Sequence, residues 1–233
     1  MNRLRLAVLG AGRMGRAVAE LAPGRDFEVS QPSTAQLRAA LTRDLLAGAD
    51  VAIEFTAADA APGIIRACAA AGCPVVSGTT GWDAERAAVE ADVTRLGGAL
   101  LWAPNFAIGV HLFAKLVAEA GRRFAAAGGF DAHIVETHHA AKKDAPSGTA
   151  KLLRRCLADA SAGDVPVTSV RTGSVPGTHT VIFDAPFEQV RLEHEARDRR
   201  VFAAGALTAA RWLAGRRGIF TLDAVLGTEE GTP

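Results

Sequence analysis

The feature that most constrains the fold is a glycine-rich turn close to the start of the chain. The apolar run at 6–9 leads directly into Gly10-Ala11-Gly12-Arg13-Met14-Gly15, where the pattern of an amphipathic helix begins. A GxGxxG sequence is informative only where it connects a strand to a helix, as it does here. Its first glycine allows a tight turn, its second lets another group approach the backbone, and its third lets the helix pack closely on the strand. We therefore expect a strand, a tight turn and a helix in direct succession.

Strand-like and helix-like segments alternate through the rest of the first half. The strand-like runs lie at 51–55, 74–77 and 99–102, and helical patterns follow them at 60–71, 83–95 and 108–127. This alternation is typical of a parallel sheet with helices on both faces. Together with the glycine turn it predicts a Rossmann-like, doubly wound α/β domain that binds a dinucleotide, with the pyrophosphate at the helix N-terminus. A glycine-rich turn that holds no ligand is the alternative.

The pattern changes after Gly128-Gly129. Strand-like stretches follow at 130–137, 165–171, 178–184 and 187–194, with one helix from 148 to about 160. In the last stretch Val190 and Leu192 alternate with polar residues, as in a strand with one solvated face. This half is predicted to be an α+β domain. The Ala-rich tail from about Val201 is expected to be helical and to pack back on the first domain, so we place the domain boundaries at 1–106 with 200–233, and at 107–199.

Composition limits the partners. The chain has 26 Lys+Arg and 25 Asp+Glu, a net charge of +1, and so lacks the basic surplus of a nucleic-acid or electrostatic membrane binder. Three cysteines are too few for a disulfide framework, and no apolar stretch reaches the roughly 18 residues of a spanning helix. We expect a soluble cytoplasmic protein with no nucleic-acid partner and no membrane partner.

The second expected strand, at 27–30, bears on cofactor choice. An acidic residue at the end of this strand usually holds the adenosine ribose of NAD. Here Glu28 lies within the strand rather than at its tip. We therefore expect that NADPH is not strongly excluded, and that Arg13 or a nearby basic residue meets its 2′-phosphate.

The segment from Glu136 to Ala150, ETHHAAKKDAPSGTA, carries the chemistry of the second half. It leaves a strand and enters a helix that Asp144 or Ser147 can cap, with Pro146 in its first turn. The helix N-terminus would then offer backbone amides as an anion site.

Two adjacent histidines and a lysine stand beside that helix start. His138, His139 and Lys142 would form a cationic pocket suited to carboxylates, with a proton donor whose pKa is near neutrality. A solvated basic loop before a capped helix is the alternative. We expect no metal, because adjacent histidines point to opposite sides of an extended chain and the cysteines are distant in sequence.

These residues carry a resemblance to a known family. Over nearly its whole length the chain resembles the 4-hydroxy-tetrahydrodipicolinate reductases (dihydrodipicolinate reductases) of the diaminopimelate route to lysine. The matching blocks are GAGRMGR at 10–16, EFT at 54–56, GTTGW at 78–82, APNF at 103–106, HHxxKxDAPSGT at 138–149 and RxxFAxGA at 199–206.

The resemblance implies an activity and a set of site residues. The reaction would be the NADPH- or NADH-dependent reduction of a cyclic unsaturated dicarboxylate with loss of water. His138 would be the general acid, with Lys142 as a further proton donor. The substrate carboxylates would be bound by His139, Lys142, Gly148, Thr149 and Arg199. The cofactor would lie against Gly10, Ala11, Gly12, Arg13, Met14, Phe55, Thr56, Gly78, Thr79, Thr80, Ala103, Pro104, Asn105 and Phe106.

The resemblance also implies an assembly. The second domain would bind substrate and build a homotetramer through its sheet, while the first would bind the dinucleotide. Two departures from the family pattern fall on the adenosine side: the glycine turn is one residue shorter than GxxGRMG, and the region between Ser30 and Val51 is short. They leave the NADH or NADPH preference open. A non-catalytic NAD(P)-sensing or ligand-binding module could keep Gly10–Gly15 and lose His138 and Lys142, but both are present.

Overall fold

The computed structural model describes residues 3–32, 46, 48–161 and 164–227. The chain forms two compact units, the first made of Met1–Phe106 and Arg200–Pro233 and the second of Ala107–Arg199. Most of the short region between Ser30 and Val51 lies outside the described residues. No helix in the described ranges combines the length and apolarity needed to cross a membrane.

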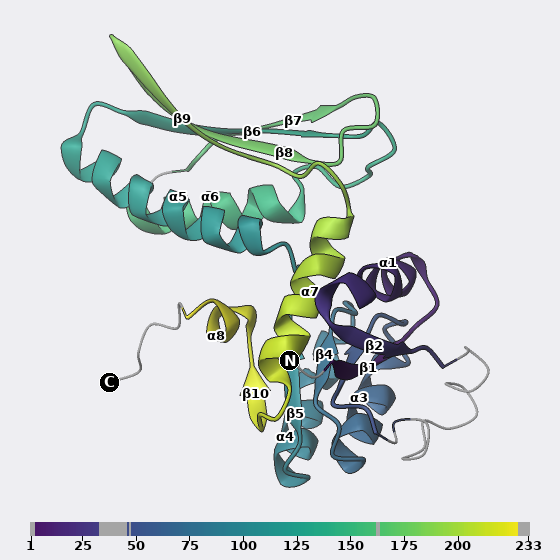
Figure 1. Ribbon diagram of the computed structural model, residues 1–233. Coiled ribbons are helices and arrows are strands. Elements are labelled where there is room, and N and C mark those ends of the chain that lie inside the picture. The colour runs from purple at the N-terminus through teal and green to yellow at the C-terminus, as the bar shows by residue number, and fades with distance from the viewer. Residues whose placement is uncertain (1–2, 33–45, 47, 162–163, 228–233) are drawn as a thin grey trace. The chain divides into compact units, whose positions relative to one another are not determined.

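The first unit is built on a parallel sheet of six described strands (Figure 1). Their order is β10-β5-β4-β3-β1-β2, and every neighbouring pair is parallel. The strands are β1 Leu4–Leu9, β2 Phe27–Ser30, β3 Val51–Glu54, β4 Val75–Ser77, β5 Ala99–Trp102 and β10 Gly218–Phe220. The helices are α1 Arg13–Leu21, α3 Ala61–Ala70, α4 Arg86–Arg95, α7 Arg200–Leu213 and α8 Leu222–Leu226, with short 3₁₀ turns at Pro23–Arg25 and Asp83–Glu85.

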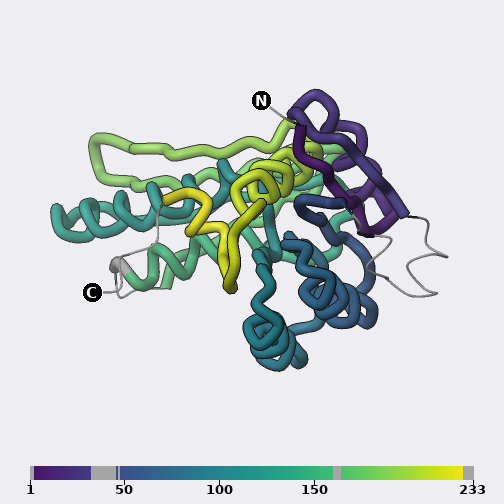
Figure 2. The backbone as a smooth tube through the Cα atoms, turned by 60° about the horizontal axis from the view of Figure 1, so that its bottom comes forward, coloured from purple at the N-terminus to yellow at the C-terminus, as the bar shows by residue number. Residues whose placement is uncertain are grey.

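Helices cover both faces of this sheet, as the alternating pattern predicts. Successive strand residues point to opposite faces, so Leu6 and Val8 pack in one core cluster while Ala7 and Leu9 pack in another. The first cluster includes buried residues of α1 and α7, and the second those of α3 and α4. Figure 2 traces the backbone of these helices around the strands. Burial on both faces explains why these strands are continuous apolar runs.

The C-terminal tail completes the first unit. Helix α7 contacts β3, β4 and β5 and packs beside α1. Its buried Ala203, Ala206, Ala210 and Leu213 form one stripe in the same core cluster. Strand β10 and helix α8 were not expected; β10 has three residues, too few to show a period, and it pairs with β5, which is distant in sequence.

The second unit is a mixed sheet with two helices on one face (Figure 1). Its strands are β6 Asp131–His138, β7 Val167–Arg171, β8 Thr178–Ala185 and β9 Glu188–Glu195, in the order β7-β6-β8-β9. Strand β6 is parallel to β7 and antiparallel to β8, which is antiparallel to β9. Helices α5 Ile108–Ala127 and α6 Gly148–Ser161 bury Val117 and Leu153 against Ile134, Val181 and Phe183. The α+β prediction is confirmed.

The other face of this sheet carries no helix from the described residues. In β9 the residues Val190 and Leu192 face the core, while Gln189, Arg191 and Glu193 are exposed, as the alternation predicts. One end of the helix-covered face is polar, and the candidate site lies there.

Candidate active site

The predicted cofactor residues of the first unit lie at one edge of its sheet. Gly10, Phe55, Gly78 and Ala103 follow directly on β1, β3, β4 and β5, which are consecutive neighbours. Because these strands are parallel, their carboxyl ends meet at the same edge, where open α/β sheets bind ligands. The structure thus brings together the four sequence blocks from which the cofactor residues were predicted.

The glycine turn has the geometry that its sequence predicts. Gly10 has a φ of +126°, and a Cβ there would lie 2.1 Å from the Phe55 carbonyl oxygen. A Cβ on Gly15 would lie 1.9 Å from the Gly10 carbonyl oxygen, so a glycine is needed for α1 to approach β1. Gly12 is the N-cap of α1 and has no atom within 4 Å of the place of a Cβ. Open space over a helix N-terminus fits a pyrophosphate.

A buried carboxylate orders the loops that follow β3 and β4. Glu54 is fully buried and accepts hydrogen bonds from the Thr56 amide at 2.7 Å, the Ser77 hydroxyl at 2.6 Å and the Thr79 hydroxyl at 2.6 Å. The Thr56 hydroxyl also donates to it. Sequence reasoning gave Glu54 no role, since nothing in a strand-end glutamate reveals that two loops converge on it.

Aromatic side chains support the same loops. The indole N–H groups of Trp82 and Trp102 both donate to the Thr79 carbonyl, at 2.8 and 3.0 Å. The rings of Phe55 and Phe106 pack edge to face with centroids 6.1 Å apart. A Cβ on Gly78 would meet the Phe55 ring at 2.0 Å. The predicted nicotinamide loops are therefore held by packing and hydrogen bonds.

In the second unit, one polar residue from each strand lies in a row across the helix-covered face. The register places Glu136 of β6 opposite Ser169 of β7 and His179 of β8, and His179 opposite His194 of β9. Glu136 and His179 are buried. His138 lies two residues beyond Glu136 on β6 and thus on the same face.

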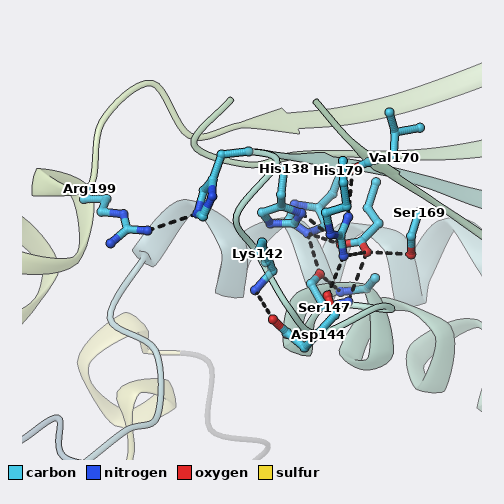
Figure 3. A network of polar contacts seen from close by, with 12 residues as sticks. His138, Lys142, Asp144, Ser147, Ser169, Val170, His179 and Arg199 are labelled. Carbon is cyan, nitrogen blue, oxygen red and sulfur yellow. Dashed lines mark hydrogen bonds and ion pairs between the residues drawn. The ribbon is translucent and has the colours of Figure 1, made fainter. Parts of the chain in front are cut away.

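Glu136 is the centre of this cluster. Its neighbours His138, Ser147, Ser169 and His179 are labelled in Figure 3. Its Oε1 accepts hydrogen bonds from the Ser147 amide at 3.1 Å, the Ser169 hydroxyl at 2.7 Å and the Arg171 guanidinium at 2.7 Å. Its Oε2 lies 3.1 Å from His138 Nδ1 and 3.8 Å from His179 Nε2. Burial acts to raise the pKa of Glu136, but hydrogen bonds from Ser147, Ser169 and Arg171 outweigh it and lower the pKa from 4.5 to about 2.

Burial favours the neutral form of both histidines of the cluster. Burial lowers the pKa of His138, and the nearby Lys142 and Arg171 lower it further, against the opposing effect of Glu136. Burial, with the neighbouring His138, lowers the pKa of His179 from 6.5 to about 4. His138 is 7% exposed, so this buried residue keeps a small solvent-accessible surface.

The loop between β6 and α6 is held by three contacts. Ser147 caps α6, because its hydroxyl accepts from the Ala150 amide at 3.2 Å. Lys142 Nζ lies 2.7 Å from Asp144 Oδ1, so Asp144 pairs with the lysine and does not cap the helix. Arg171 also donates to the Asp144 carbonyl. The expectation that Pro146 lies in the first helical turn is wrong; it precedes the cap, because α6 begins at Gly148.

The remaining predicted substrate residues lie at this helix start and in a contact between His139 and Arg199. Gly148 is exposed and Thr149 half-buried at the first positions of α6. The Arg199 guanidinium lies 3.2 Å from His139 Nε2, apart from the network around His138 in Figure 3. The structure brings His139 and Arg199 together, and His138 close to Glu136, Arg171 and His179.

Sequence reasoning missed Glu136, Ser169, Arg171 and His179 as members of the site. A signal for Glu136 existed, since residues two apart on a strand share a face. For the other three the strand register was needed.

Among the described residues, Glu136, His138 and His179 form a group whose ligand atoms lie within 4.8 Å of one another, a spacing that a metal ion could bridge. The guanidinium of Arg171 already neutralises this carboxylate at 2.7 Å. We therefore assign no metal, and its expected absence stays a prediction.

The comparisons with known proteins agree in one family. The models described as "Dihydrodipicolinate reductase, N-terminus" and "Dihydrodipicolinate reductase, C-terminus" match residues 4–106 and 109–226. A 4-hydroxy-tetrahydrodipicolinate reductase of Methanoregula boonei is 36% identical, over 97% of this chain and 99% of that protein. One of Christiangramia forsetii is 33% identical, over 96% of this chain and 98% of that protein.

A solved structure has the same fold. The dipicolinate-bound dihydrodipicolinate reductase of Paenisporosarcina sp. TG-14 superposes with a TM-score of 0.77 at 21% identity, covering 94% of this chain and 97% of that one. The fold class, enzyme class and family expected from the sequence are thereby confirmed. The chain belongs to the dihydrodipicolinate reductase family.

Proposed function

We propose that this chain reduces 4-hydroxy-tetrahydrodipicolinate to tetrahydrodipicolinate with loss of water, using NADPH or NADH, in diaminopimelate and lysine biosynthesis. The observation that carries this proposal is the loop from His138 to Thr149. It combines a buried imidazole, a lysine ammonium and the N-terminus of a capped helix. A proton donor beside an anion site is what reduction of a dicarboxylate ring requires.

The cofactor is held by the strand-end loops of the first unit. The glycine turn takes the pyrophosphate at the α1 N-terminus, and the loops that carry Phe55–Thr56, Gly78–Thr80 and Ala103–Phe106 take the nicotinamide. When bound, the cofactor supplies a hydride to the ring. Glu54 and the two indoles keep the nicotinamide loops in place by the hydrogen bonds described above.

The substrate carboxylates are bound by the second unit. The amides of Gly148 and Thr149 at the α6 N-terminus take one, because that helix end carries partial positive charge. The cationic Arg199 with His139 takes the other, and Lys142 exchanges its Asp144 partner for the substrate. Fixed cations of this kind both orient the ring and stabilise negative charge that develops during the reaction.

His138 donates a proton to the substrate, and Lys142 is a second proton donor. Burial lowers the pKa of the His138 imidazole and so favours its neutral form. The protonated imidazole therefore gives up its proton readily. Lys142 contributes its ammonium charge next to the reacting ring.

NADPH is accepted as well as NADH. Glu28 is exposed in the middle of β2 and does not stand at the strand tip, and Arg13 is the first residue of α1 and exposed. Both observations favour room for a 2′-phosphate. Steady-state kinetics test this: a kcat/KM ratio above about 100 in favour of NADH, or about 2.7 kcal/mol, overturns it.

The active form is a cytoplasmic homotetramer built through the sheet face of the second unit that lacks helices. Val170, which is 38% exposed, lies on that face, as do Thr180 and Arg191. Size-exclusion chromatography coupled to light scattering, at micromolar protein concentration, gives the oligomeric state. A monomer under these conditions contradicts the assignment.

One assay tests the activity itself. Freshly generated substrate is mixed with NADPH and the enzyme, and the loss of nicotinamide absorbance is followed. We expect consumption that depends on both substrate and enzyme. Consumption no faster than background would favour a module that binds the dinucleotide without catalysis.

A further inference from the structure

The Glu136 carboxylate lies next to His138, the proposed proton donor. The two residues alternate on β6, and the carboxylate is fully buried while its Oε2 lies 3.1 Å from His138 Nδ1. Within the described part of the chain, neither of these two buried atoms is in hydrogen-bonding geometry with any group. A small rotation of the imidazole would pair them, and the other imidazole that faces the same oxygen, His179 Nε2, lies farther from it at 3.8 Å.

We infer that Glu136 is a positioning residue for the reduction: its carboxylate holds the proton of neutral His138 on Nδ1, orients the ring, and leaves Nε2 as the atom that exchanges a proton with the substrate. This inference rests on the proposed role of His138. The nitrogen of a histidine that carries the proton is set by the partner of the other nitrogen, and a carboxylate accepts only from N–H.

The surroundings of Nε2 support this assignment. A Cβ on Gly177 would come within 3.0 Å of His138 Nε2, so only a glycine lets this backbone lie so close to the ring without a side chain against Nε2. The Nδ1 side, by contrast, faces the buried carboxylate. The two nitrogens therefore have different environments: Nδ1 faces a buried carboxylate, and Nε2 faces a glycine that places no side chain against it.

The same carboxylate also fixes the proposed anion site. Glu136 Oε1 accepts from the amide of Ser147, whose hydroxyl caps α6 and lies 3.1 Å from His179 Nε2. The helix start with Gly148 and Thr149 is thus tied to the strand that carries His138. One buried charge aligns the proton donor with the amides that bind the substrate.

Charged and titratable groups face His138 from every neighbouring element. They are Glu136 on β6, Arg171 on β7, His179 on β8, and Lys142 and Asp144 in the loop. Of these, Glu136 is the nearest anion, and it favours the protonated imidazole. Arg171 keeps that carboxylate ionised by its hydrogen bond. Removing the charge of Glu136 should therefore lower the pKa of His138.

The test is Glu136→Gln, measured as kcat, KM and a full pH–rate profile. We expect kcat to fall about 10- to 100-fold, the range found when the hydrogen-bond partner that orients a metal-bound histidine is removed. Since a general acid works only while protonated, the alkaline limb of the profile should move to lower pH by about one unit. KM should change less than kcat, because the glutamine oxygen can still accept from Ser147. The matched control is Glu188→Gln, the same change at an exposed position at the far end of β9, which should leave kcat and the profile unchanged.

A second variant covers the case in which Glu136→Gln does not fold. Glu136→Asp keeps the charge beside Arg171 but withdraws it from His138 by one methylene. It should lower kcat and leave the alkaline limb near its wild-type position. Wild-type kcat in this variant, or wild-type kcat and an unmoved limb in Glu136→Gln, overturns the inference. His138→Ala separates the two levels: near-normal turnover there defeats the proposed role of His138 itself, whereas slow turnover there with a normal Glu136→Gln enzyme defeats only the positioning role.

Discussion

Two alanine substitutions in the glycine turn separate folding from cofactor binding. A Cβ on Gly15 would lie 1.9 Å from the Gly10 carbonyl oxygen, and neither atom can be moved away by rotating a side chain. Helix α1 would have to move off β1 until the contact reached at least 3.0 Å. Overpacking of this kind costs about 3 kcal/mol, at the upper end of the usual range. For a chain of this size that corresponds to a fall in Tm of about 6–12 °C.

Gly12→Ala is the matched change with the opposite signature. Gly12 has a φ of −72°, which alanine adopts readily, and a Cβ there would meet no protein atom within 4 Å. We expect a fall in Tm of only about 2–4 °C, because glycine is preferred over alanine at a helix N-cap by about 1 kcal/mol. The new methyl group occupies the space assigned to the pyrophosphate, so the Kd for NADPH should rise at least about tenfold, or ~1.4 kcal/mol.

Differential scanning fluorimetry and titration calorimetry with NADPH measure both quantities on both variants. Wild-type melting of Gly15→Ala would contradict the close approach of α1 to β1. Wild-type NADPH affinity of a folded Gly12→Ala would show that the pyrophosphate does not lie over Gly12. A fall in Tm of Gly12→Ala as large as that of Gly15→Ala would mean that its NADPH affinity reports folding and not the site.

Two further predictions concern pH and cofactor choice. The pKa of folded Glu136 is lowered from 4.5 to about 2 and that of folded His179 from 6.5 to about 4, so both groups bind fewer protons in the folded state than in the unfolded one. Their contributions to stability are complete above about pH 6.5; that of His179 is lost as the pH falls from 6.5 towards 4, and that of Glu136 from 4.5 towards 2. Thermal melts should show a falling Tm across this window, and a Tm that rises between pH 6.5 and 4 would refute the assignment. Arg13→Ala should lower kcat/KM for NADPH by about 10-fold, or ~1.4 kcal/mol, and leave that for NADH within about twofold; equal effects on both cofactors would rule out a contact with the 2′-phosphate.

The sequence was sufficient to predict the first unit because its signals are local. The glycine turn, the apolar strands and the helices that follow them each lie within about 30 residues, the length of a βαβ unit. The predicted strand Ala99–Trp102 and helix Ile108–Ala127 agree with the structure at both ends. Strand β10 could not be predicted, because its three residues form a strand only by pairing with β5.

The site was predicted only where its residues are close in sequence. His138, Lys142, Gly148 and Thr149 lie in one segment of strand, loop and helix, and the family resemblance assigns them roles. Their partners Arg171 and His179 reach the cluster through the register of β7 and β8 against β6, which no local pattern reveals.

The pairing of Lys142 with Asp144 shows the same limit for charges. A count of basic residues predicts a cationic pocket, and the structure gives one of those cations an anionic partner two residues away. Likewise, the net charge of +1 conveys nothing about the buried Glu136, whose ionised state depends on hydrogen bonds from three separate segments.

The most direct test of the central claim is the turnover of His138→Ala and Lys142→Ala with NADPH bound. The claim is that the first unit holds the cofactor while the loop after β6 performs the acid–base work. We predict that each variant lowers kcat by at least about 100-fold, the usual scale for an acid–base group, while the Kd for NADPH stays within about twofold of wild type. Near-normal kcat in both variants would contradict the account.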